Sequence, residues 1–379
     1  MLVIRVVNGG PGAIFWMWLA AILGMTTKFA EVTLAVAYRE RNELGEYSGG
    51  PMYYIKNGLG QAWLAKVFAL FAALAAFGIG CMVQANSIAT SLLGQFNIPT
   101  WVTGALVVVS AGAILIGGIK RIGQVAEKLV PFMAAFYILG GLIILIMNAA
   151  QLPGVISSIF SNAFTGRAAF GGFAGATVGE AIRYGVARGV FTNEAGLGSA
   201  PIAHAAASTD HPARQGIWGA FEVFVDTILV CSITALVVIS SNLWNTSELE
   251  GANLTTAAFN NGLAGIGGII VTVGLVLFAF TTILGWCYYG EKSVEYLLNT
   301  SKVIMPYRAI FVALAFVGAL QEIDLVWNMA DALNALMALP NLIAVLILSP
   351  VVAKLAKQFF TDPERVYIPA DYVDIVKRK

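Results

Sequence analysis

Long apolar runs recur along almost the whole chain, and they restrict its possible folds more than any other feature. The runs lie at roughly residues 13–38, 64–93, 101–118, 129–148, 172–207, 215–241, 263–290, 304–320 and 325–353. Most reach the roughly 18–20 residues that a helix needs to cross the hydrocarbon core of a bilayer. Polar or glycine- and proline-marked connectors separate them. The pattern predicts an all-α polytopic membrane protein with about nine spans.

The last run carries Pro340, which removes a backbone donor and clashes with the preceding helical turn. This run is therefore expected to be one broken helix or a helical hairpin. The distribution of Lys and Arg favours an odd number of crossings. Connectors near 39–56, 120–128, 214 and 292–302 are basic, whereas those near 97, 149–171, 242–262 and 321–324 contain Arg167 as their single cation. By the positive-inside rule, the chain start lies outside and the C-terminus inside the cell.

Composition excludes several classes of protein. The chain is 58% hydrophobic and only 11% charged, unlike a soluble domain with about 25% charged residues. A net charge of +1 provides no basic surface for nucleic acid. There are two histidines, and no metalloprotease, nucleophile-elbow or P-loop motif is present. A channel would be expected to show a filter motif or rings of pore-lining residues, and the sequence shows neither. We expect one transmembrane domain over 1–360, a polar cytoplasmic tail over 361–379, and no enzyme activity.

The fifth run breaks the rules for a helix in lipid. Residues 185–204 contain four glycines, Pro201, and the charged residues Arg188 and Glu194. We expect a break near 192–196, because freed carbonyls and helix ends in transporters hold cations and substrate carboxylates. The alternative is a glycine-faced packing helix that is kinked at Pro201.

Polar side chains in three other runs are further candidates. Thr281, Thr282 and Trp286 lie in the seventh run, with Thr282 and Trp286 on one helical face. Threonine hydroxyls can bind Na⁺ and an indole can wall a small pocket, although packing residues would look similar. Gln84 and Asn86 could equally bind a ligand or another helix.

Charged pairs also occur inside the runs. Lys28 and Glu31 are spaced i, i+3, and Glu222 and Asp226 are spaced i, i+4. A structural or gating role is expected for them, with direct ion binding as the alternative. His204 is expected to be a helix-packing donor.

Several long motifs resemble one known family. They occur in family order over essentially the whole chain, and they read GGPGAIFWMW (9–18), GMTTKFAE (24–31), GGPMYY (49–54), VQANSIA (83–89), TNEAGLGSAPIAHA (192–205) and FTTILGW (280–286). The chain is similar to the alanine/glycine:cation symporters, which are sodium-coupled amino-acid transporters of the cell membrane. The resemblance implies two inverted five-helix repeats, with the substrate bound at the midplane between discontinuous helices.

The resemblance also implies roles for individual residues. The substrate-binding set would be Gln84, Asn86, Phe191, Asn193, Gly196, Thr282 and Trp286. Hydroxyls of Thr192 or Thr281 would bind sodium, which is the coupling ion, and no organic cofactor is expected. A small pocket closed by Trp286 suits alanine or glycine. We expect a monomer in the bilayer.

One departure from the family concerns the start of the chain. Family members carry a further broken helix, with a Gly-Thr-Gly-Asn-like element, just before the motif that begins at Gly9. The sequence therefore predicts a fold that lacks its first broken helix, and an inactive fragment is one alternative function. The other is a carrier coupled to protons or another cation, for which Glu194 and Asp226 are the candidate titrating groups.

Overall fold

The computed structural model describes residues 10–164, 178–246, 249, 251–321 and 323–364, and it is almost entirely helical. The first half contains α2 (Gly12–Ala37), β1 (Glu40–Arg41), β2 (Tyr47–Ser48), α3 (Pro51–Leu59), α4 (Ala62–Ala75), η2 (Ala76–Met82), α5 (Val83–Phe96), α6 (Thr100–Leu115), α7 (Gly118–Met147), η3 (Ala149–Gln151) and α8 (Leu152–Phe164). The second half contains α9 (Val178–Asn193), α10 (Ala200–His204), α11 (Pro212–Val223), η4 (Phe224–Cys231), α12 (Ser232–Ser240), α13 (Leu243–Thr246), α14 (Gly251–Gly262), α15 (Gly267–Leu298), η5 (Ser301–Val303), α16 (Ile304–Leu320) and α17 (Ile323–Thr361).

Seven helices of the described chain are long and apolar enough to cross a membrane, so the protein is an all-α, multi-pass membrane protein. They are α2, α4 with η2 and α5, α7, α11 with η4 and α12, α15, α16, and the part of α17 from 332 onward. The 16-residue α6 is shorter, and the pair α9 and α10 is interrupted. A total of nine spans stays a prediction.

The observed helices follow the predicted runs closely, with a few differences. Helix α17 continues through Pro340 and Pro350, so the expectation that the last run is a broken helix or a helical hairpin is wrong. Helix α7 begins at Gly118, eleven residues before its predicted run. Two predicted connectors, 149–171 and 242–262, contain the helices α8 and α14. The part of the fifth run at 172–177 lies outside the described residues.

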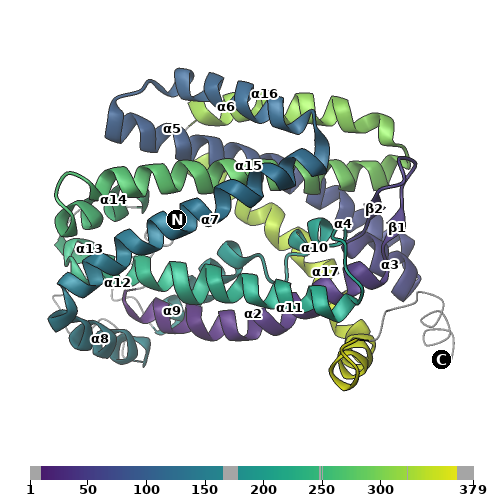
Figure 1. Ribbon diagram of the computed structural model, residues 1–379, viewed down its shortest axis with the longest axis horizontal. Helices are drawn as coiled ribbons and strands as arrows, with labels where there is room; N and C mark the ends of the chain where they lie inside the picture. The colour runs from purple at the N-terminus through teal and green to yellow at the C-terminus, as the bar shows by residue number, and fades with distance from the viewer. Residues whose placement is uncertain (1–9, 165–177, 247–248, 250, 322, 365–379) are drawn as a thin grey trace.

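The helices form an elongated bundle (Figure 1), in which α15 runs through the middle, α5, α6 and α16 lie along one side, and α2, α9 and α11 along the other. The helices α8, α13 and α14 gather at one end of the bundle, and the β1–β2 hairpin, α3 and α10 gather at the other. Connectors predicted for opposite sides of the membrane thus lie at opposite ends. The main apolar core joins α3, α4, η2, α5, α15, α16 and α17.

Close helix contacts depend on glycine. A Cβ on Gly318 would lie 2.5 Å from the Cα of Met82, and one on Gly185 would lie 2.4 Å from the carbonyl oxygen of Ala13. Small residues let membrane helices approach in this way, since lipid provides no hydrophobic drive between helices. Large apolar side chains such as Leu106 and Ile146 are exposed on the outer surface, as lipid contact requires.

Charged side chains tie the hairpin end of the bundle together. Lys292 is buried and forms ion pairs with Glu46 of the hairpin connection at 3.2 Å and with Glu295 at 2.9 Å. Arg308 of α16 pairs with Glu291 of α15 at 2.6 Å. These ion pairs hold the hairpin and α16 against the C-terminal end of α15. Trp286 lies further inside the same helix.

Candidate functional site

The fifth run is interrupted between Asn193 and Ala200, which confirms the predicted break. Three residues of this interruption have left-handed backbone: Glu194 (φ +57°), Gly196 (φ +89°) and Gly198 (φ +79°). Glycine takes this conformation without steric cost. Helix α9 thus ends directly before the left-handed Glu194, and the two glycines allow the backbone to stay irregular up to Ser199.

Side chains from two distant helices satisfy the backbone of the break. Lys28 Nζ of α2 donates to the carbonyl oxygen of Asn193 at 2.8 Å. Glu31 Oε2, one turn later, accepts from the N–H of Gly196 at 3.2 Å, and Asn341 Nδ2 of α17 donates to the carbonyl of Gly196 at 2.9 Å. An irregular segment inside a membrane bundle requires such partners, because lipid offers none.

Asn341 connects three elements at the break and is completely buried. Its amide also donates to Glu31, and its Oδ1 accepts from the hydroxyl of Tyr54 in α3. Sequence analysis did not single out Asn341. The signal was the same that drew attention to Gln84 and Asn86, namely an amide inside an apolar run, here beside Pro340.

Trp286, which belongs to α15, contacts another side of the break. Its Nε1 donates to Glu194 Oε1 at 2.9 Å, and the other carboxylate oxygen accepts from Ser199 Oγ at 2.6 Å. A Cβ on Gly80 would lie 2.0 Å from the Cβ of Trp286, so only glycine at this position of η2 allows Trp286 its place. The indole is 2% exposed.

A second polar chain leaves the break toward η4. Asn193 Nδ2 donates to Thr227 Oγ1 at 3.0 Å, and Thr227 Oγ1 donates to Asp226 Oδ2 at 3.0 Å. The π-helical segment η4 therefore adjoins the break through Thr227, and the π-helical segment η2 lies against Trp286 through Gly80. Such segments are rare and occur frequently at functional sites.

The threonines proposed for sodium have hydroxyls that act as donors. Thr281 bonds the carbonyls of Leu277 and Phe278, each at 3.0 Å, and Thr282 bonds that of Phe278 at 2.8 Å. The Thr192 side chain is hydrogen-bonded with Cys231. A hydroxyl has two acceptor lone pairs, so donating its proton leaves the oxygen able to bind a cation.

Three other predicted residues, Gln84, Phe191 and Asn86, make contacts of different kinds. Gln84 Nε2 donates to the carbonyl of Ile79 at 3.1 Å. Helices η2–α5 and α15 are neighbours, and a Cβ on Gly80 would lie 2.0 Å from the Cβ of Trp286. Phe191 is half-buried. The guanidinium carbon of Arg188 lies over its ring, 5.3 Å from the ring centroid.

Asn86 contacts a different part of the bundle. It donates to the carbonyls of Gly318 at 3.2 Å and Gln321 at 2.7 Å, so in this structure its amide joins α5 to the end of α16.

Acidic side chains surround the break. Lys28 interacts electrostatically with Glu31, Glu194, Glu222 and Asp226. Glu222 also pairs with Nε2 of His204 at 3.1 Å. His204 therefore joins α10 to α11, as expected of a packing donor.

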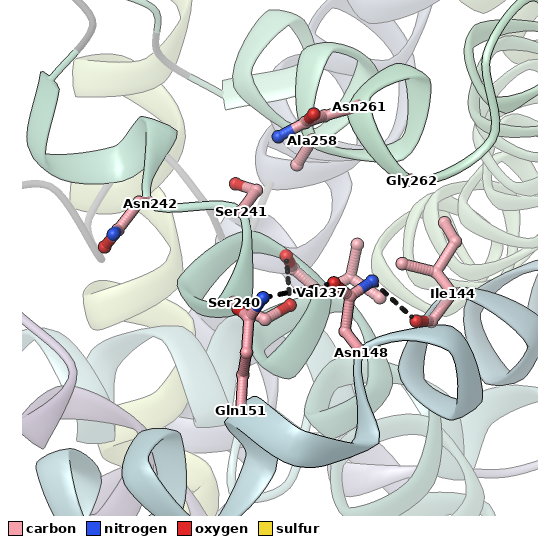
Figure 2. Close-up of a pocket in the computed structure, with 10 residues that line it drawn as sticks. All are labelled: Ile144, Asn148, Gln151, Val237, Ser240, Ser241, Asn242, Ala258, Asn261 and Gly262. Atoms are coloured by element: carbon pink, nitrogen blue, oxygen red, sulfur yellow. Dashed lines mark hydrogen bonds between the residues drawn. The ribbon is translucent and has the colours of Figure 1, made fainter.

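A separate polar cavity of about 310 Å³ lies between the ends of α7 and α12 and the helix α14 (Figure 2). Amide and hydroxyl side chains, including Asn148, Gln151, Ser241 and Asn261, line much of it. None of the residues at the break lines this cavity. It is therefore distinct from the candidate site.

Comparisons with known proteins agree on the class of the molecule. The family model described as the sodium:alanine symporter family matches residues 2–369. A Haemophilus influenzae protein named as an uncharacterized transporter is 51% identical over 354 residues, covering 93% of this chain and 77% of that protein. The sodium/alanine symporter AgcS of Methanococcus maripaludis is also 51% identical, over 360 residues, covering 93% of this chain and 78% of that protein.

A solved structure shares the fold. A manganese transporter mutant from Eremococcus coleocola matches with a TM-score of 0.64 at 14% identity, over 93% of this chain and 76% of that one. At this identity the likeness concerns the fold alone. Together with the broken helix and the matched length, the comparisons make the protein a membrane transporter and not an enzyme, and the chain belongs to the sodium:alanine symporter family.

Proposed function

We propose that this protein carries out sodium-coupled symport of small neutral amino acids, alanine and glycine, across the cell membrane, with its C-terminus in the cytoplasm. Membership of the family and 51% identity to a sodium/alanine symporter support the substrate and the ion. The observation that carries the proposal is the pairing of Trp286 with Glu194 at the interrupted helix. This pairing places a large, rigid aromatic wall beside irregular backbone deep in the bundle.

Several of the proposed substrate-binding residues belong to the elements that meet at this point. Asn193 and Gly196 belong to the break, Phe191 precedes it, and Trp286 with Thr282 approaches from α15. Gln84 and Asn86 lie on α5, which packs beside α15. The indole of Trp286 occupies the space that a longer substrate side chain needs, which favours alanine and glycine.

Sodium is proposed to bind oxygen atoms of Thr192 and Thr281. Na⁺ is a hard cation and binds neutral carbonyl and hydroxyl oxygens well. The Thr281 hydroxyl donates its proton to its own helix and keeps its lone pairs for a ligand. A bound Na⁺ beside the break would couple the ion to the segment that holds the amino acid.

The test is uptake of labelled alanine by cells or proteoliposomes that contain the protein, with sodium replaced by choline. Sodium symport predicts uptake that is lost in choline and inhibited by unlabelled glycine. Uptake of the same rate in choline would refute sodium coupling. A pH jump that drives uptake without sodium would instead favour the proton-coupled alternative, for which Glu194 and Asp226 lie at the break.

A further inference from the structure

Lys28 carries a positive charge into the interior of the bundle. Its side chain is 0% exposed, and its Nζ donates to the carbonyl oxygen of Asn193, the last residue of α9, at 2.8 Å. A buried ammonium loses its hydration, so it persists only where other groups compensate. Charges inside membrane helices are costly, and they mark functional positions by default.

Carboxylates of the surrounding helices lie within electrostatic range of this ammonium, whereas its direct hydrogen bond goes to the backbone. Lys28 interacts electrostatically with Glu31 of its own helix, Glu194 of the break, Glu222 of α11 and Asp226 of η4. One ammonium therefore binds a helix end directly and has four acidic side chains within its electrostatic range. Without the Lys28 ammonium, the oxygen atoms in this part of the bundle would have no cation beside them.

Packing fixes the position of the ammonium. A Cβ on Gly219 of α11 would lie 3.3 Å from Lys28 Cγ and 3.4 Å from the Lys28 carbonyl oxygen, so the stem lies directly against α11. One turn earlier, a Cβ on Gly24 would lie 3.2 Å from the Cβ of Ala195 in the break. Helix α2 is thereby locked to both α11 and the break, and Lys28 meets the carbonyl of Asn193 at one defined place.

This place has the chemistry of a cation site. The C-terminal end of a helix carries partial negative charge on its unpaired carbonyls. Carbonyl, carboxylate and hydroxyl oxygens are the ligands of hard monovalent and divalent ions. The carbonyl oxygen of Asn193 binds the ammonium directly, and the side chain of the same residue is hydrogen-bonded to the Thr227 hydroxyl. The Lys28 ammonium is the cation that contacts this helix end in the structure.

We propose that Lys28 is a built-in cation, which replaces one sodium ion at the end of α9 and so lowers by one the number of sodium ions that the protein binds. The structural part of this inference stands on the contacts of Lys28. Its consequence for ion counting in transport rests on the proposed function.

The experiment measures thermal unfolding of the purified, full chain in detergent, without amino acid, in sodium chloride against choline chloride at equal ionic strength. Lys28→Gln retains a hydrogen-bond donor without the charge, Lys28→Met removes both, and Lys28→Arg retains the charge. Lys66→Met is the matched control, since Lys66 is an exposed lysine of α4.

In choline, the Gln and Met variants should unfold roughly 5 °C or more below wild type, because the buried end of α9 and the carboxylates near it have lost their cation. Sodium should restore roughly half or more of that loss, by binding the folded state. Wild type, Lys28→Arg and Lys66→Met should show no comparable extra dependence on sodium.

Other outcomes overturn the proposal. If Lys28→Gln unfolds like wild type in choline, the hydrogen bond and not the charge is what matters. If the neutral variants are equally unstable in both salts, or fail to fold in sodium, no ion replaces Lys28.

A second readout is the sodium dependence of alanine uptake, whose Hill slope should rise by about one in Lys28→Gln. An unchanged slope in an active variant contradicts the proposal. Absence of alanine uptake in wild type would refute the proposed function, while the unfolding experiment would still decide the role of Lys28.

Discussion

The Trp286→Phe substitution isolates one interaction at the candidate site. Phenylalanine keeps an aromatic ring against Gly80 but has no donor for Glu194, whose Oε1 now accepts from the indole at 2.9 Å. The other oxygen of Glu194 keeps its bond from Ser199. The substitution therefore leaves one partly buried acceptor without its donor, and it also shortens the ring that packs edge-on against Tyr289.

The size of the effect follows from this geometry. Leaving a buried polar group unsatisfied costs about 1–3 kcal/mol. If the Trp286–Glu194 bond is needed in the transport-competent state, the loss corresponds to a roughly 5- to 150-fold decrease in uptake efficiency, at 1.36 kcal/mol per factor of ten. The same bond should contribute to the free energy of unfolding.

The assay is a double-mutant cycle with Trp286→Phe, Glu194→Gln and the pair, each measured for alanine uptake and thermal unfolding. Two side chains that interact should give a coupling energy of about 0.5–3 kcal/mol. Trp63→Phe is the control, because that indole is 65% exposed and bonds only to nearby Gln61 among the described residues. A coupling energy near zero, or uptake equal to that of wild type in a folded Trp286→Phe protein, would refute the reasoning.

Three further substitutions test other parts of the site. Trp286→Ala should admit larger amino acids such as leucine and weaken alanine uptake, at a packing cost on the order of 3–5 kcal/mol; unchanged selectivity in a folded variant would remove Trp286 from the pocket. Gly198→Ala should lower the unfolding temperature, because a Cβ there would lie 2.5 Å from Pro51 Cγ at φ +79°, a strain of about 1–3 kcal/mol; wild-type stability would show that the break relaxes freely. Asn341→Leu should reduce both stability and uptake, since Glu31 and the Gly196 carbonyl lose a donor, and thermal unfolding equal to wild type would contradict its role as the connecting residue.

Much of the fold was predictable because the lipid environment restricts a chain to a few solutions. The apolar runs located the long helices, and the left-handed positions Gly196 and Gly198 were visible as glycines in the fifth run. Pro340 was misleading: it suggested a hairpin, yet α17 continues through it, since neighbouring helices can compensate for a lost backbone bond. Helices α8 and α14 were missed because they lie in connectors.

The partners within the site were much harder to predict. Glu31 and Asn341 are separated by 310 residues, and Trp286 and Glu194 by 92. Sequence spacing has no information on such pairs until the helices are placed in three dimensions. It marked Lys28 and Glu31 as unusual intramembrane charges, but it could not show that both bind the backbone of the break.

The most direct test of the account is a cryo-EM map of the purified protein with alanine and sodium. The account predicts density for the amino acid beside the interrupted helix, in contact with Trp286 and near Glu194. Density for alanine confined to the polar cavity between α7, α12 and α14, with the break unoccupied, would contradict it.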